Sequence, residues 1–256
     1  GARHHPCMIV GSTGEPGRRA RITLAPRSRG FGDPARPKHV LRFWARQCIQ
    51  GWKADEAVSE DNFTREQANI SMNQILCSVD IAIGEDNPGA VGLYLRSAQG
   101  SGAQDCTIDA RHGHAGLEGG AGSGGAHLGV TILGGRIGLD LTNSQPASTI
   151  CGITLIGQTQ AALVYSGAQT LAAVGLRIRP AAGAAAILCN PRGDKSPFHG
   201  HLALVDSVAP QAQEMVRAKE TAALGLAARL GDHDRARQAA ERLFGLRLDA
   251  ESQMQL

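Results

Sequence analysis

The chain has 256 residues, a formal net charge of +3, 33 glycines and an aromatic content of 4%. The small positive charge is dispersed, and no basic run interleaves aromatic residues, so we do not expect nucleic-acid binding. No stretch of about twenty apolar residues is present, so the sequence predicts no membrane-spanning helix. The six cysteines form no Cys-x-x-Cys motif, which argues against zinc or redox chemistry.

Residues 1–68 form the less regular part of the chain. Short β-patterns occur at Met8–Val10, Arg21–Leu24 and Val40–Trp44, and turn-like Gly/Pro segments separate them. We interpret these strands as early coils of a repeat structure with larger insertions. The polar residues 45–68 are expected to form an excursion loop.

A five-fold internal repeat follows, with two short strand patterns in each unit. The first strand is centred in turn on Ile81, Ile108, Ile132, Leu155 and Leu176, and the second on Leu93, Leu117, Leu139, Leu163 and Ile187. Self-similarity every 20–30 residues or so, with strand alternation, is typical of a β-solenoid. We therefore predict an all-β fold in which residues one repeat apart become neighbours.

Strand alternation predicts which side chains face inward. The central aliphatics and the residues two positions away should form the core, and the intervening positions should face outward. In the second strand, the position before the centre should then form an outward column of small residues that leaves the backbone open: Gly92, Gly116, Gly138, Ala162 and Ala186.

The regular coils are expected over residues 69–208, with His201–Val205 as a further strand. From residue 209 the pattern changes, and two amphipathic helices are expected. The first carries Met215, Leu224, Leu226 and Leu230, and the second Ala236, Ala239, Leu243 and Leu246. We expect 209–256 to cap the open end of the solenoid, with a separate partner-binding helical hairpin as the alternative.

Several segments resemble bacterial proteins of the pectate-lyase superfamily, which are related to polygalacturonases and exo-1,3-glucanases. The segments are Asn87–Leu93, Ala98–Ser101, Ala115–Gly119, Gly122–Gly125, Gly134–Asp140, Gln145–Pro146, Leu155–Gln158 and, upstream, Phe31–Phe43. The likeness spans roughly residues 6–190 and does not include 209–256.

The resemblance implies a right-handed parallel β-helix and a polysaccharide or oligosaccharide substrate. Members are usually longer and commonly exported, so we expect a piece of a longer, secreted or periplasmic protein, although this chain displays no signal peptide. The resemblance supplies no catalytic residues.

Candidate catalytic residues come instead from the predicted columns. The position after the second-strand centre carries Tyr94, Glu118 and Asp140, so the two carboxylates should be neighbours about 4.8 Å apart on one outer face. Such a pair suits the acid and base, or acid and nucleophile, of a glycoside hydrolase. Tyr94 is expected to stack on a sugar or donate its hydroxyl, and Arg136 to bind a uronate or hydroxyl groups. Gly116 and Gly138 should line the site.

Asp105, Asp109, His112 and His114 form a second candidate cluster. Two histidines separated by one residue can meet a metal ion, but surface histidines of a loop are the simpler interpretation. We predict no metal site, and calcium is expected only if the protein is a polysaccharide lyase.

We therefore expect a glycoside hydrolase. The alternatives are a polysaccharide lyase and a non-catalytic glycan-binding or structural β-helix. The sequence does not specify the oligomeric state.

Overall fold

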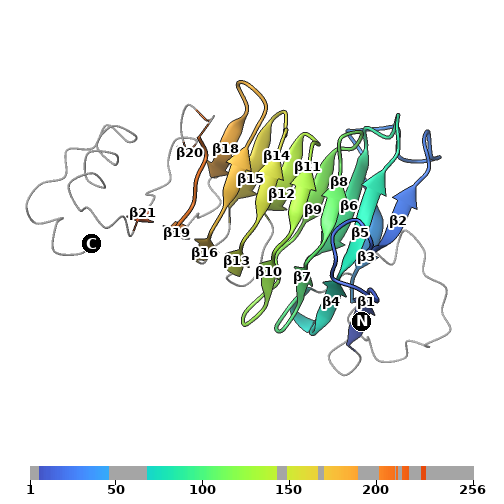
Figure 1. Ribbon diagram of the computed structural model, residues 1–256, viewed down its shortest axis with the longest axis horizontal. Coiled ribbons are helices and arrows are strands. Elements are labelled where there is room, and N and C mark those ends of the chain that lie inside the picture. The colour runs from blue at the N-terminus through green and yellow to red at the C-terminus, as the bar shows by residue number, and fades with distance from the viewer. Residues whose placement is uncertain are drawn as a thin grey trace, which may run out of the picture.

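A computed structural model describes residues 6–45, 68–142, 149–166, 170–189, 202–210, 212, 215–218 and 226–228 (Figure 1). Within these ranges the chain is almost entirely β, with three parallel sheets and one short 3-10 helix, η1 (Ala68–Ile70). The all-β prediction is confirmed.

Up to β19, each sheet takes every third strand of the chain. The first sheet contains β1 (Cys7–Val10), β4 (Gln74–Cys77), β7 (Gly102–Gln104), β10 (Ala126–Leu128), β13 (Thr149–Cys151), β16 (Leu171–Val174), β19 (Leu202–Val205) and β21 (Leu226–Ala228). The second contains β2 (Ala20–Leu24), β5 (Val79–Ile83), β8 (Thr107–Asp109), β11 (Thr131–Leu133), β14 (Thr154–Ile156) and β17 (Arg177–Arg179). The third contains β3 (Lys38–Phe43), β6 (Ala90–Leu95), β9 (Ala115–Glu118), β12 (Ile137–Leu141), β15 (Ala161–Tyr165), β18 (Ala185–Cys189) and β20 (Val216–Ala218).

This strand order defines a parallel β-helix, in which three strands make one coil and successive coils stack. Figure 1 shows the stack advancing along the long axis, from the blue strands β1–β3 to the orange strand β19. The early strands β1, β2 and β3 pair with β4, β5 and β6. The three early strand patterns therefore belong to the stack, and the further strand near residue 203 is confirmed. The rest of the region predicted to form early coils, residues 1–5 and 46–67, lies outside the described residues.

One residue with left-handed backbone turns the chain from the first sheet to the second in six coils. These residues are Ser78, Asp105, Gly129, Gly152, Gly175 and Asp206, with φ between 48° and 66°. Glycine adopts this conformation without strain, and Asp tolerates it better than most residues. In five of these turns the amide hydrogen-bonds to the next coil at 2.9–3.0 Å. The corner therefore repeats with the same geometry in successive coils.

The core consists of stacked aliphatic side chains. In the second sheet Ile81, Ile108, Ile132 and Leu155 lie in register, as predicted, and the next member of the column is Ile178 rather than Leu176. The shift is two residues, so Leu176 still faces inward and is fully buried. The repeat spacing therefore predicted the correct face but not the exact register in this coil.

The predicted repeat contained two strands, whereas each coil has three. The repeat pattern did not predict the strands of the first sheet, because they are only three or four residues long and their inward side chains differ in chemical character from coil to coil. In successive coils they include Leu76, Ala103, His127, Ile150 and Ala173.

The predicted outward orientation of the glycine column in the third sheet is wrong. A Cβ atom on Gly92 would lie 2.6 Å from Cγ2 of Ile108, and one on Gly116 would collide with Ile132, so both positions face the interior. Gly138 faces inward as well, 3.2 Å from the Gln158 side chain. These positions are small because the core of the second sheet fills the space opposite them.

Strict alternation is interrupted in these strands, which explains the error. Ala161 and Val164 are three residues apart, yet both belong to a small cluster separate from the main core, together with Ala185 and Leu188. Leu163 and its neighbour Ala162 both belong to the main core. The position two residues before each centre therefore lies on the outer side of the third sheet.

The described part of the C-terminal segment also differs from the prediction. Val216–Ala218 and Leu226–Ala228 are strands that pair with β18 and β19, where one helix was expected. The strands β18 and β19 offer unpaired backbone N–H and C=O groups at the edges of their sheets. Hydrogen bonds to these groups stabilise β-strands here more than the helical sequence pattern stabilises a helix. The second predicted helix lies outside the described residues.

Buried polar side chains hold the coil corners. The Asn87 amide donates to the carbonyls of Ala25, Gly84 and Glu85 and accepts from the Ser28 amide. At another corner the Gln158 amide donates to three carbonyls. These contacts join one coil to the next.

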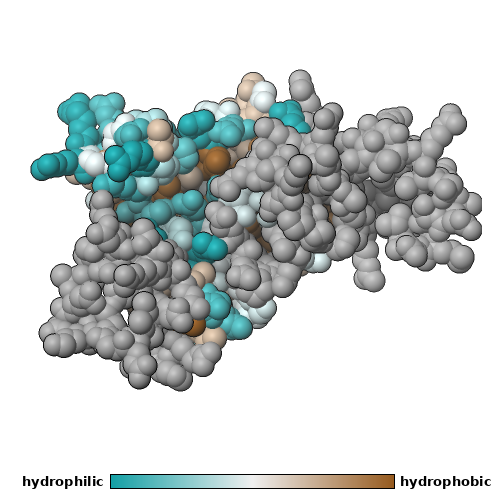
Figure 2. Space-filling model, turned by 180° about the vertical axis from the view of Figure 1, so that it is seen from behind, coloured by the Kyte–Doolittle hydropathy of each residue, from teal (hydrophilic) through white to brown (hydrophobic). Residues whose placement is uncertain are grey.

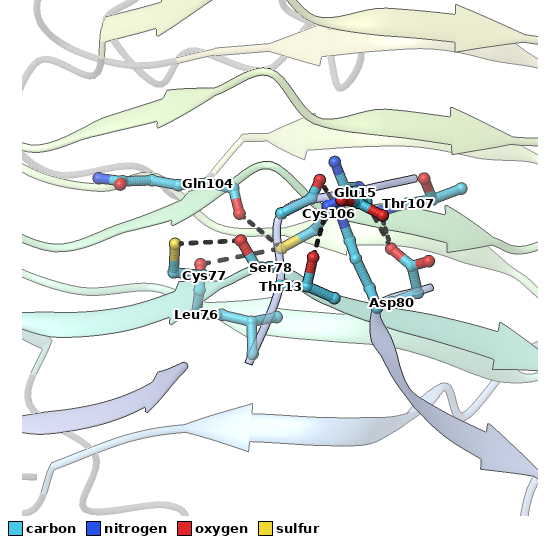
Figure 3. A network of polar contacts seen from close by, with 11 residues as sticks. Thr13, Glu15, Leu76, Cys77, Ser78, Asp80, Gln104, Cys106 and Thr107 are labelled. Atoms are coloured by element: carbon cyan, nitrogen blue, oxygen red, sulfur yellow. Dashed lines mark hydrogen bonds and ion pairs between the residues drawn. The ribbon is translucent and has the colours of Figure 1, made fainter. Parts of the chain in front are cut away.

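The N-terminal loop is tied to the stack through Asp80 (Figure 3). One Asp80 carboxylate oxygen accepts from the Thr107 amide at 2.8 Å and pairs with Arg19 at 3.4 Å, and Arg19 also donates to the carbonyl of Gly14. Figure 2 shows hydrophilic residues gathered at the N-terminal end of the molecule. The N-terminal loop also carries an exposed ion pair, Arg18–Glu15.

Candidate active site

Glu118 and Asp140 lie side by side on neighbouring strands of the third sheet. Their Cα atoms are register partners in the β9–β12 ladder, and Tyr94 and Arg42 continue the same column on β6 and β3. Neighbouring strands lie about 4.8 Å apart, so the two carboxylates share one small area of the outer face. The predicted juxtaposition of Glu118 and Asp140 is therefore confirmed.

His39 reaches from β3 across β6 to Glu118. Its Nε2 lies 2.6 Å from a carboxylate oxygen of Glu118, although the two residues are 79 positions apart in the chain. The His39 ring lies 4.5 Å from the Tyr94 ring, centre to centre. The histidine is therefore fixed by an aromatic contact on one strand and a carboxylate on the next.

Glu118 is held in its ionised form. Burial alone would raise its pKa, but the hydrogen bond and charge of His39, together with the charges of His114 and Arg42, place the pKa below its ordinary value. Its side chain retains 34% exposure. Glu118 therefore offers an accessible carboxylate at neutral pH, suited to a base or nucleophile and not to an acid.

Asp140 is oriented by the end of its own strand. One carboxylate oxygen accepts hydrogen bonds from the Thr142 amide at 2.9 Å and the Thr142 hydroxyl at 2.7 Å. These two bonds fix the side-chain rotamer of Asp140. The second carboxyl of the pair is thus positioned independently of Glu118.

His114 and Arg136 complete the surroundings of the pair. The amide of Arg136 donates to the carbonyl of His114 at 2.8 Å, which joins the two segments. Burial and the charge of Arg136 hold the pKa of His114 below its ordinary value, against the opposing effect of Glu118 and Asp140. Arg136 is exposed and donates to Gln160.

Two expectations about the surroundings need correction. Tyr94 is not an open stacking surface, because it is only 8% exposed and the Arg42 guanidinium carbon lies 4.5 Å from its ring centre. Its hydroxyl role remains a prediction. Gly116 and Gly138 face the interior, so they do not present an open backbone strip to a substrate through their Cα positions.

The sequence analysis missed His39, Arg42 and Thr142. The segment Val40–Trp44 was recognised as a strand but was not aligned with the second-strand repeats. That alignment would have placed Arg42 in the column of Tyr94 and Glu118. The contact between His39 and Glu118 spans the intervening strand β6, and the repeat pattern does not predict such a contact.

The predicted cluster of Asp105, Asp109, His112 and His114 does not form one site, because Asp109 and His114 interact with different groups. Asp109 forms an ion pair with Arg111, whose hydrogen bond holds the pKa of Asp109 below its ordinary value, whereas the charge of His114 interacts with Glu118 and Asp140. Within the described ranges no three His, Cys, Asp or Glu side chains gather in a way that could hold a metal ion.

Comparison with known proteins adds no relative. No protein-family model, curated protein or solved structure matches this chain. The described residues include no helix with the length and apolar character needed to span a membrane.

Proposed function

We propose that the outer face of the third sheet hydrolyses glycosidic bonds, with Glu118 and Asp140 as the reacting carboxyl groups. The observation that carries this proposal is their register pairing on neighbouring strands within a cluster of His39, His114 and Arg42. Retaining glycosidases hold their two carboxyl groups about 5–5.5 Å apart, which matches the spacing of neighbouring strands.

The environment of Glu118 assigns it the attacking role, and Asp140, as the other carboxyl group of the pair, takes the role of acid. The Glu118 carboxylate attacks the anomeric carbon, while the Asp140 carboxyl gives its proton to the leaving oxygen as the glycosidic bond breaks. The Asp140 carboxylate then takes a proton from water, which displaces Glu118 from the sugar. The lowered pKa of Glu118 supports its assignment as the nucleophile. The resemblance to exported carbohydrate-active proteins supports a polysaccharide substrate outside the cytoplasm.

The test is incubation with a panel of neutral and acidic polysaccharides, with products read by mass spectrometry. Wild-type protein should release oligosaccharides that have gained one water, and Glu118→Gln and Asp140→Asn should each lower the rate by at least about 100-fold. Asp109→Asn is the matched control, because Asp109 lies in the second sheet and pairs with Arg111. Full activity in both site variants would contradict the proposal.

Elimination is the second candidate, and the basic groups around Glu118 favour it. His39, His114 and Arg42 all lie close enough to influence the Glu118 carboxylate, and such groups also suit an acidic sugar and proton abstraction. A lyase would release unsaturated products without gain of water in the same panel. Binding without any product would instead identify a glycan-binding β-helix.

A further inference from the structure

The outer face of the third sheet is buried on both sides of Glu118 and Asp140, which we call the acid pair. On β6, one coil before the pair, Tyr94 is 8% exposed. On β15, one coil after it, Ala161 is fully buried and Val164 is 2% exposed. The outer columns of the second sheet, by contrast, are half-buried or exposed on β8, β11, β14 and β17. A polysaccharide that ran along the solenoid axis would have to pass over Tyr94 and Val164, so their burial excludes that path.

The same face is accessible in the direction of the strand β12. Asp140 and Ile137 are both half-buried, and Arg136, immediately before the strand, is exposed. Four residues separate Arg136 from Asp140, which corresponds to about 13 Å of extended chain at about 3.3 Å per residue. The accessible surface therefore leads from the acid pair across the sheet and not from coil to coil.

Two exposed polar side chains, Arg136 and Gln160, lie at the far end of this surface. Nη2 of Arg136 donates to Oε1 of Gln160 at 3.1 Å, and the backbone amide of Gln160 donates to the carbonyl of Arg136 at 2.9 Å. These two bonds hold the guanidinium at the edge of the third sheet. A guanidinium has five N–H donors, and its hydrogen bond to Gln160 uses one of them. Such a group suits the hydroxyl or carboxylate oxygens of a sugar.

Ile137 lies between the two polar ends of this surface. It is half-buried and packs against the apolar cluster that contains Ala161 and Val164. The surface therefore has carboxylates at one end, an aliphatic side chain in the middle and a guanidinium with an amide at the other end. Ligand sites commonly combine an apolar lining with a few placed polar groups, and an oligosaccharide has C–H faces and hydroxyl groups that match both.

We propose that the substrate chain lies across the third sheet, along β12, from the acid pair over Ile137 to a subsite formed by Arg136 and Gln160. This inference rests on the proposed function, because it places the reacting glycosidic bond at the acid pair. The length of the path, about 13 Å, corresponds to a trisaccharide. Sugar units up to that length should each add contacts, and further units should extend beyond the edge of the sheet without adding any.

The experiment is titration calorimetry of Glu118→Gln, which should not turn over its ligand, with β-1,3-linked glucose oligomers and galacturonic acid oligomers of two to six units. For the series that binds, affinity should rise at least about 10-fold from two units to three and then change less than about 2-fold. Adding Arg136→Ala should abolish this rise and leave the affinity for two units unchanged, and Gln160→Ala should reduce the rise. Arg179→Ala is the matched control, because Arg179 is an exposed arginine of the second sheet.

Turnover of the same oligomers by wild-type protein separates this inference from the proposed function. Affinity that keeps rising to six units, or Arg136→Ala that binds every length like its parent, would overturn the path across the sheet even if the wild type hydrolyses the oligomers. The expected dependence on length without any hydrolysis would support the path and contradict the proposed function. No binding of any oligomer would overturn the path as well. Circular dichroism of each variant checks that it is folded.

Discussion

His127 lies in the interior of the coil, and both of its ring nitrogens have partners. The Ala103 amide donates to Nδ1, and Nε2 donates to the carbonyl of Gly119, each at 3.1 Å. This geometry fixes a neutral ring that joins the first sheet to the end of β9. Burial, opposed only by the Gly119 carbonyl, lowers the pKa of His127 to about 4 from an ordinary value of 6.5.

The depressed pKa of His127 predicts a loss of stability in acid. Between pH 6.5 and about 4 the unfolded chain binds a proton at this site and the folded chain does not, so the free energy of unfolding falls as pH falls. The loss should total about 3 kcal/mol, at about 1.4 kcal/mol per pH unit. Urea unfolding of wild type and His127→Gln at pH 7, 6, 5 and 4 measures it. Parallel pH profiles for the two proteins would contradict the prediction.

At the scale of the strand, β6, β9 and β12 each carry a glycine because core side chains from the opposite side of the coil occupy the space that a larger side chain would need. The sequence pattern placed them correctly in one column, but their side of the sheet depends on an interruption of alternation that only the packing reveals. Gly116 is the clearest case, because its missing side chain leaves room for Ile132 of the second sheet and for the carbonyl of Gly138.

Gly116→Ala should therefore destabilise the fold. The added methyl group would overlap Ile132 and lie 2.9 Å from a backbone oxygen that cannot easily move, at an expected cost of about 1–3 kcal/mol. Urea unfolding at neutral pH measures the difference. Gly32→Ala is the control, since a Cβ there would meet nothing within 4 Å. Equal urea concentrations at the unfolding midpoint for Gly116→Ala and wild type would contradict the prediction and would mean that β9 accommodates the methyl group without loss of stability.

For the whole molecule, stacking makes contacts between neighbouring coils the main source of stability. Each coil's strands pair with the coil before and the coil after, and the core runs continuously from Phe43 to Val216. In such an array the terminal coils open at lower free energy than the central ones.

This architecture predicts different effects for the same kind of core truncation in different coils. Ile132→Ala in β11 and Leu202→Ala in β19 both remove a fully buried side chain, at about 2–5 kcal/mol. Hydrogen exchange followed by mass spectrometry should show that Leu202→Ala exposes amides only in β16–β19, whereas Ile132→Ala exposes coils on both sides of β11. Uniform acceleration in Leu202→Ala would mean that the solenoid unfolds as one unit.

The sequence alone predicted the solenoid, because stacking the repeats buries their aliphatic strand centres in one continuous core. It also predicted that Glu118 and Asp140 would be neighbours, since equal positions in successive repeats stack wherever the repeat keeps its register. Tertiary structure decided what local pattern does not encode: the third strand of each coil, the inward glycines, the strands β20 and β21, and the reach of His39 to Glu118. These depend on contacts between residues far apart in the chain, and such contacts exist only once the coils are packed against one another.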